Sequence, residues 1–233
     1  MYKLTVNEIK QIRSLREKKY RDESGLFIVE GEKMVSEVLT SGLEVIRVIR
    51  RDDAGDELMK RLSTCNSPSP VLAVVRKPSP AAHGVSGLCL ALDNVRDPGN
   101  MGTILRIADW FGIDCLFASH GSVEVFNPKV VQASMGAVLR KKLIYCDLVE
   151  KCREFRQAGK DVFGTFLQGD DIYGETLPGE GLIVMGNESD GISPAVAAEC
   201  SRRLTIPSFG GGAESLNVSV ATAVVVSEFR RHR

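Results

Sequence analysis

Glycine, amide and charged residues gather at three places in the chain, each directly after a short apolar run. The first group runs from Asn94 to Arg106, the second covers residues 186–193 and the third covers residues 207–217. Glycines let a backbone come close to a bound group, and an arginine fork binds anionic oxygens such as those of a phosphate. These residue types predict a site that holds a ligand against the backbone and an anion against a guanidinium.

Several familiar kinds of site are excluded. The pattern G-x-G-x-x-G of dinucleotide-binding proteins is absent, and so is the phosphate-binding pattern G-x-x-x-x-G-K-[ST]. The histidines at 83, 120 and 232 form no cluster, and the six cysteines are scattered without a C-x-x-C pair. We therefore predict no metal site, and we interpret the cysteines as small buried residues rather than as disulfides or zinc ligands.

A sheet is needed to bring the three groups together. Apolar runs at 88–92, 182–185 and 204–206 precede them, and further strand-like runs at 114–118, 142–145 and 161–166 alternate with helical patterns. This alternation predicts an α/β fold with a mostly parallel six-stranded sheet covered on both faces. Ligands of such sheets bind beyond the carboxyl ends of the strands, where all three groups lie.

The residues around these groups predict specific helix boundaries. We expect a turn at 93–102 and a short helix from Thr103 to Phe111. Ser215 is the predicted N-cap of a last helix that continues to Phe229, because its hydroxyl can accept a hydrogen bond from an otherwise unpaired helix amide.

The first part of the chain predicts a separate small α/β unit. Helical spacing at 6–20, 32–40 and 56–64 alternates with strand-like runs at 26–29, 45–49 and 71–75. The segment 77–87 then combines prolines, glycines and small residues without periodicity, which is typical of a linker. We predict two domains, at residues 1–83 and 84–233.

Charge and hydropathy limit the partners. The net charge is zero, although Lys10 to Arg21 is rich in basic residues. That stretch fits either a contact surface for RNA phosphates or a solvated helix face. No apolar run is long enough for a membrane span, and the first residues do not resemble a signal peptide. We therefore expect a cytoplasmic protein.

The three groups together resemble the SpoU/TrmH family of RNA ribose 2′-O-methyltransferases, within the SPOUT superfamily. The resemblance covers about residues 88–229. Its first motif, N-x-x-D-P-x-N-x-G-x-x-x-R, is matched by Asn94, Asp97, Pro98, Asn100, Gly102 and Arg106. The second, G-x-E-x-x-G, is matched by Gly186, Glu188 and Gly191, and the third by Ile206, Pro207 and Ser215 to Ala221. The loop after Pro207 is about one glycine longer than in the family, and Ser208 stands where methionine is more frequent.

The resemblance implies a C-terminal α/β domain with a trefoil knot, S-adenosylmethionine as cofactor, and a homodimer with its active site at the subunit interface. Residues 1–83 resemble the small RNA-binding domain that many members carry. The resemblance favours ribosomal RNA over transfer RNA as the substrate. Two alternatives stay open: a non-catalytic RNA- or ribosome-binding protein on the same scaffold, and, more distantly, a nucleotide-dependent enzyme of the Rossmann type.

The resemblance also assigns roles to residues. Catalytic candidates are Arg106, Asn94, Glu188, Ser215 and Asn217. Cofactor candidates are Thr165, Phe166, Gly186, Asn187, Ile206, Pro207 and Leu216. RNA-binding candidates are Arg13, Lys18, Lys19 and Arg21. Because arginine stays protonated, we expect Arg106 to grip an RNA phosphate and stabilise the developing alkoxide; direct action as the base is the other possibility. Asn94 is expected to orient Arg106 or the ribose.

Overall fold

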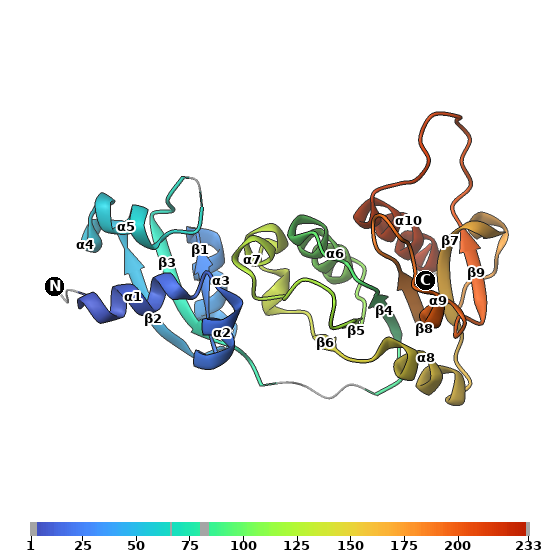
Figure 1. Cartoon of the computed structure of the whole chain (residues 1–233), viewed down its shortest axis with the longest axis horizontal. Coiled ribbons are helices and arrows are strands. Elements are labelled where there is room, and N and C mark those ends of the chain that lie inside the picture. The colour runs from blue at the N-terminus through green and yellow to red at the C-terminus, as the bar shows by residue number, and fades with distance from the viewer. Residues whose placement is uncertain (1–3, 66, 80–83, 232–233) are drawn as a thin grey trace. The chain divides into compact units, whose positions relative to one another are not determined.

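The computed structural model describes residues 4–65, 67–79 and 84–231 (Figure 1). The chain forms two compact units. The first contains residues 1–79 and 124–140, and the second contains residues 80–123 and 141–233. The predicted domain boundary at residue 83 lies outside the described residues and stays a prediction. The inclusion of residues 124–140 in the first unit was not expected, because no turn-rich or linker-like composition marks that segment.

The first unit has a three-stranded antiparallel sheet in the order β1-β3-β2. The predicted strands and helices are present, with a short helix α4 between β2 and α5 that the sequence did not indicate. The elements of residues 1–79 are α1 (Val6–Ser14), α2 (Lys18–Ser24), β1 (Leu26–Glu30), α3 (Glu32–Thr40), β2 (Val45–Arg50), α4 (Arg51–Ala54), α5 (Asp56–Leu62) and β3 (Val71–Arg76).

The predicted helix at 6–20 is in fact two helices. Thr5 and Glu8 form a capping box at the start of α1, and the chain leaves the helix after Ser14. In the break, the Arg16 guanidinium donates to the carbonyl oxygens of Arg61 and Ser63, at 3.0 and 2.6 Å. These contacts with residues about 45 positions away explain the break, because helical periodicity continues through it.

The second unit is built on a six-stranded sheet in the order β6-β5-β4-β8-β7-β9, in which every neighbouring pair is parallel. Its strands are β4 (Leu88–Leu92), β5 (Cys115–Ala118), β6 (Leu143–Tyr145), β7 (Val162–Asp171), β8 (Gly181–Met185) and β9 (Arg202–Thr205). The prediction of an α/β fold with a mostly parallel sheet is therefore confirmed.

Helices and short helical turns complete the chain after β4. They are α6 (Pro98–Trp110), α7 (Pro128–Ser134), η1 (Ala137–Leu139), α8 (Leu148–Gln157), η2 (Ile172–Gly174), α9 (Pro194–Ala197) and α10 (Val218–Arg230). Of these, α7 and η1 belong to the first unit. Between α7 and η1 the helical path is interrupted at Met135 and Gly136, which both have positive φ.

Two helix starts differ from the prediction. Helix α6 begins at Pro98, inside the expected turn, because Asp97 caps it and proline suits the first helical position. Helix α10 begins at Val218, and its N-cap is Asn217, whose Oδ1 accepts from the amides of Ser219 and Val220. The prediction that Ser215 caps the last helix is wrong. A cap acts only from the residue next to the helix, and the chain stays non-helical through Asn217.

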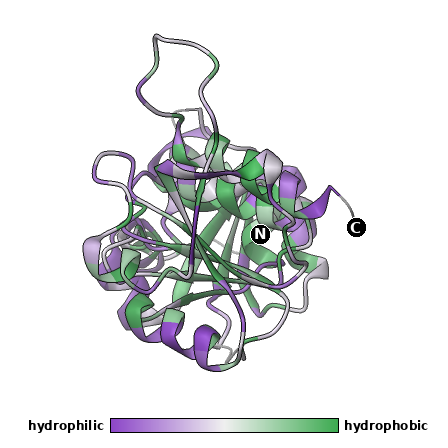
Figure 2. Ribbon diagram, turned by 90° about the vertical axis from the view of Figure 1, so that its right-hand side faces the viewer, coloured by the Kyte–Doolittle hydropathy of each residue, from purple (hydrophilic) through white to green (hydrophobic). Residues whose placement is uncertain are grey.

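Strands β4, β5 and β8 of the second unit are buried along their whole length, whereas β7 is exposed from Leu167 onward. The hydropathy colours of Figure 2 show apolar strands at the centre and polar segments at the periphery. One core cluster on this sheet joins residues of β4, β5, β8, α8 and α9. The loop between β9 and α10 extends away from the sheet (Figure 1). No helix within the described residues is long and apolar enough to span a bilayer. The trefoil knot stays a prediction.

Candidate active site

A cavity of about 1170 Å³ opens at the carboxyl ends of β7, β8 and β9. Three segments line it: residues 165–168 of β7, the turn after β8, and the long loop between β9 and α10. All seven predicted cofactor residues line this cavity: Thr165, Phe166, Gly186, Asn187, Ile206, Pro207 and Leu216. The sheet order explains the grouping, because β8, β7 and β9 are neighbours and end at the same edge.

The wall after β8 is made largely of backbone. Asn187 and Gly191 exchange two backbone hydrogen bonds of 2.9 and 3.0 Å, and Gly191 has a φ of 68°. Gly186 packs so closely against this turn that a Cβ there would lie 2.2 Å from the carbonyl carbon of Gly191 and 2.3 Å from the amide nitrogen of Ile192. The backbone of the turn therefore fills the space that a side chain at position 186 would need, and only glycine fits there.

We expect Gly186→Ala to weaken ligand binding in this cavity by about tenfold or more and to cost about 1–3 kcal/mol of stability. The added methyl group meets backbone atoms, which cannot rotate aside as a side chain would. Calorimetric titration of S-adenosylmethionine and thermal unfolding test both effects. Gly211→Ala is the matched control, because no atom lies within 4 Å of the Cβ it would add. If the two variants bound S-adenosylmethionine equally well, this cavity would not be its binding site.

Hydrogen bonds join the three sequence motifs at the rim of the cavity. The Asn217 side-chain amide donates to Oδ1 of Asn100 at 3.0 Å, and the Asn100 amide donates to Oε1 of Glu188 at 2.7 Å. Asn217 therefore caps α10 with its oxygen and binds the first motif with its nitrogen. Among the catalytic candidates, Glu188 and Ser215 line the cavity, whereas Asn217 contacts the cavity wall through this network.

Asn100 was not among the predicted site residues, yet it joins the first motif to both of the others. Its place in the first motif was the available signal, but a helix-capping role explained it equally well from sequence. In the structure Asp97 takes the cap, and its Oδ1 accepts from the Asn100 amide at 2.8 Å. The Asn100 side chain is left for the contact with Glu188.

Asn94 forms hydrogen bonds with residues at the strand ends and not with Arg106. It has a φ of 55°, its side-chain amide donates to Asp93 at 2.9 Å, and its carbonyl oxygen accepts from the Asn187 amide at 2.7 Å. Asp93 is 2% exposed and also accepts from the Ser193 backbone. Within the described part of the chain, Asn94 forms no hydrogen bond with Arg106; the expectation that Asn94 orients Arg106 or the ribose stays a prediction.

Arg106 lies on the exposed side of α6. Its spacing places it on the same face as Gly99, Thr103 and Trp110, and Trp110 is 86% exposed. Arg106 does not line the cavity, and it has no hydrogen bond or ion pair with any residue in the described ranges. A single chain therefore brings the predicted cofactor residues together but leaves the predicted catalytic arginine without a partner.

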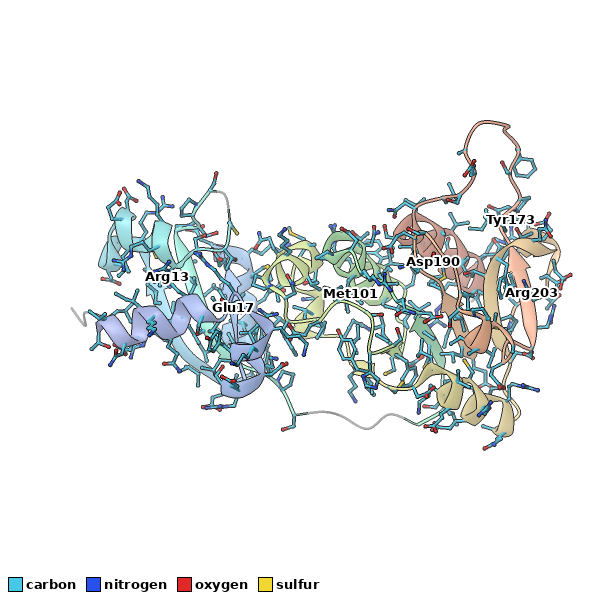
Figure 3. The ribbon with its side chains drawn as sticks, viewed as in Figure 1. Arg13, Glu17, Met101, Tyr173, Asp190 and Arg203 are labelled. Carbon is cyan, nitrogen blue, oxygen red and sulfur yellow. The ribbon has the colours of Figure 1, made fainter. Side chains whose placement is uncertain are left out.

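The predicted RNA-binding residues separate into two kinds. Arg13, Lys18 and Lys19 are exposed; Figure 3 labels Arg13 on α1. Arg21 is 1% exposed. Its guanidinium donates to Glu124 at 2.6 and 2.9 Å, and also to two backbone carbonyls. The prediction that Arg21 binds RNA is wrong, because every one of these donors faces protein.

The cysteines are free thiols and do not form a reactive group. Burial raises the pKa of Cys89 and Cys152 to about 12 and that of Cys115 and Cys200 to about 11. Such thiols stay protonated at neutral pH and are poor nucleophiles and poor metal ligands. The described residues also contain no group of three or more side chains suited to a metal ion. Two of the three histidines, at 83 and 232, lie outside those residues.

The chain matches two known protein families. The family described as SpoU rRNA Methylase family matches residues 87–227. The chain belongs to the SpoU rRNA methylase family. A second family, described as MRM3-like substrate binding domain, matches residues 7–74.

Members of the SpoU family resemble the chain over its whole length. The 23S rRNA (guanosine(2553)-2′-O)-methyltransferase RlmP of Bacillus subtilis is 28% identical over 96% of both chains. A protein of Porphyromonas gingivalis assigned to the TrmH family of RNA methyltransferases superposes with a TM-score of 0.91, at 42% identity and full coverage of both chains. An AdoMet-bound rRNA methyltransferase of Sinorhizobium meliloti gives a TM-score of 0.90 at 28% identity, covering 100% of this chain and 97% of the other.

Proposed function

We propose that this SpoU-family protein transfers a methyl group from S-adenosylmethionine to a ribose 2′-hydroxyl of ribosomal RNA, in the cytoplasm. The observation that carries the proposal is the cavity at the strand ends, where residues of the second and third motifs meet and the first motif is hydrogen-bonded to both. The relatives' named activity and the AdoMet-bound neighbour support it.

The cavity suits a bent nucleoside cofactor. Gly186 lines the cavity without a side chain, and apolar residues such as Leu204, Ile206 and Val225 line the interior. Thr165 lies just past the part of β7 that pairs with β8, and its hydroxyl donates to the carbonyl oxygen of Val184 at 2.9 Å, so it shapes the wall between β7 and β8. When bound, S-adenosylmethionine supplies the activated methyl group. The protein holds the cofactor and excludes water.

In the proposed reaction, a bond forms between the ribose 2′-oxygen and the methyl carbon, and the carbon–sulfur bond breaks with its electron pair on sulfur. The 2′-hydroxyl proton leaves to the RNA phosphate or to water. Arg106 grips that phosphate and stabilises the oxygen as it becomes negative. Ser215 faces the cavity as a ribose contact, and Glu188 holds the loops through Asn100.

We propose that the active unit is a homodimer, in which Arg106 of one subunit serves the cavity of the other. Helices α6 and α10 pack against each other, and they expose Trp110 and Val220, at 86% and 49%. A second copy that packed on these two helices would cover both side chains. Sedimentation should give twice the mass of one chain, and a monomer at micromolar concentration would contradict the dimer.

A transfer assay tests the proposed function directly. The protein is incubated with methyl-labelled S-adenosylmethionine and with ribosomal RNA from a strain that lacks it. Label should appear at one nucleotide whose 3′ phosphodiester resists alkali, the property of a 2′-O-methylated ribose. RNA binding without label would favour the non-catalytic alternative on the same scaffold.

We further propose that residues 1–83 bind the RNA, with Arg13, Lys18 and Lys19 on the contact surface; the match to a substrate-binding family over residues 7–74 supports this. Lys18 and Lys19 are 65% and 71% exposed and form only exposed ion pairs, with Asp22 and Glu23. The Lys18 ammonium holds the pKa of Asp22 below its ordinary value. Pairs of this kind exchange readily for phosphate contacts.

Changing Lys18 and Lys19 together to glutamate should weaken RNA binding several-fold and lower the slope of log affinity against log salt by about 1–2. Phosphate contacts release counterions, so their loss flattens the salt dependence. Fluorescence anisotropy with a fragment of 23S rRNA measures both. Lys60→Glu with Arg61→Glu carries the same charge change on α5 and serves as control. If the Lys18→Glu, Lys19→Glu variant bound RNA as tightly as wild type, the basic stretch would be a solvated helix face and not an RNA contact.

A further inference from the structure

Arg203 lies on the cavity wall with its guanidinium stacked on an aromatic ring. Its Cζ lies 3.4 Å from the centroid of the Phe166 ring, and both residues line the cavity. A Cβ at Gly164 would lie 2.5 Å from the Phe166 ring and 2.6 Å from the Cys200 sulfur. The Phe166 ring therefore packs closely on the backbone of Gly164 as well as on the Arg203 guanidinium.

Stacking fixes the plane of the guanidinium and leaves its edges open. The Arg203 side chain donates no hydrogen bond to any residue within the ranges that the structure describes, although a guanidinium carries five donors in its plane. Its neighbour Arg202 is occupied, because it binds Glu175 on the opposite face of β9. The stacked guanidinium of Arg203 is thus preorganised for a planar anion that accepts two parallel hydrogen bonds, such as a carboxylate.

The charge of the lining makes this position distinctive. Among the described residues that line the cavity, Arg203 is the one basic side chain, whereas Glu188, Asp190 and Glu214 are acidic; Figure 3 labels Arg203 and Asp190. Three carboxylates attract a cationic ligand but repel an anionic group on it. An anionic group on a ligand of this cavity therefore has one favourable partner in the wall.

We infer that Arg203 binds the α-carboxylate of the methionine part of the cofactor and so determines specificity for a ligand that carries the whole amino acid. The inference rests on the proposed function, since it requires S-adenosylmethionine in this cavity. Phe166 acts as a positioning residue, because its ring sets the plane of the Arg203 fork.

Calorimetric titration of four ligands against wild type and Arg203→Ala tests the assignment without any turnover. The ligands are S-adenosylmethionine, S-adenosylhomocysteine, decarboxylated S-adenosylmethionine and 5′-methylthioadenosine; the last two lack the carboxylate. Arg203→Ala should weaken the first two by about tenfold and change the last two by less than about twofold. Arg203→Lys, which keeps the charge but not the fork, should lose most of the same affinity. Arg202→Ala is the matched control and should bind all four ligands as wild type does.

Each other outcome has a distinct meaning. If wild type binds none of the four ligands, the proposed function fails. If Arg203→Ala weakens all four ligands equally, Arg203 only braces the Phe166 ring, and the inference is overturned. If it weakens none of them but lowers RNA affinity, Arg203 contacts a phosphate instead, and the inference is again overturned. Far-ultraviolet circular dichroism and the melting temperature establish that each variant is folded.

Discussion

Replacing Arg106 by alanine should lower methyl transfer to ribosomal RNA by about 100- to 1000-fold, with S-adenosylmethionine affinity within a few-fold of wild type. The size of the loss follows from removing one preorganised donor that stabilises a developing oxyanion. Cofactor affinity should persist because Arg106 does not line the cavity of its own chain. Single-turnover transfer and calorimetric titration measure the two quantities separately.

Arg153→Ala is the control for this variant. Arg153 is also an exposed arginine, on α8, where it pairs with Glu199 at 2.9 Å, and it does not line the cavity. Its loss should leave transfer within about twofold of wild type, as expected for a surface substitution. Turnover that survives Arg106→Ala would remove Arg106 from the mechanism.

The Arg106 variant also tests whether two subunits share one site. Neither Arg106→Ala nor Gly186→Ala should transfer methyl groups well alone. In a mixed dimer, one cavity has Gly186 intact in one subunit and Arg106 intact in the other, if the arginine acts across the interface. Mixing the two variants after unfolding and refolding should then restore a measurable fraction of activity. No restoration, with mixed dimers shown to form, would place Arg106 and the cavity in the same chain.

Replacing Arg21 by alanine should lower the free energy of unfolding by about 3–5 kcal/mol, because it breaks a buried ion pair from one side. Arg21 and Glu124 are 1% and 11% exposed and lie 103 positions apart in the chain. The change leaves a carboxylate and the carbonyl oxygens of Leu15 and Arg16 without this donor. Lys77, whose Nζ lies 3.1 Å from Glu124, offsets part of the loss.

Urea unfolding followed by circular dichroism measures the effect, and amide hydrogen exchange in α2 and β1 shows where it lies. Arg21→Met keeps most of the buried volume but none of the hydrogen bonds, so it separates packing from pairing. Lys19→Ala, at an exposed site with a 3.9 Å ion pair, should change stability by less than about 1 kcal/mol. An Arg21→Ala protein as stable as wild type would mean that this pair contributes nothing.

Local patterns were sufficient for most of the fold. The run Leu88–Leu92 and the helix Glu32–Thr40 have the predicted bounds, since continuous apolar residues mark a strand buried on both faces and helical spacing ended by a glycine marks a short helix. The same reasoning misplaced the start of α6. It treated Asp97-Pro98 as a turn, although aspartate followed by proline is also a strong helix start.

Contacts between distant residues were beyond the reach of the sequence. Arg21 and Lys19 have the same basic neighbours in the chain, yet one is buried on Glu124 and the other is exposed. Asn94 and Asn100 both fit the first motif, and only the folded chain shows that one anchors the strand ends while the other reaches Glu188.

Short patterns at strand ends were enough to identify the family, to predict the parallel sheet and to select residues that line one cavity, because each of these depends on local sequence. The tertiary structure decided which polar residues are exposed, which cap a helix and which are held by another motif. Those properties depend on partners tens of residues away, at distances set by the packing of the sheet and its loops. Arg203 belongs to this second kind: nothing in its sequence neighbourhood distinguishes it from Arg202, and the strand alternation of β9 alone turns one to Glu175 and the other to the cavity.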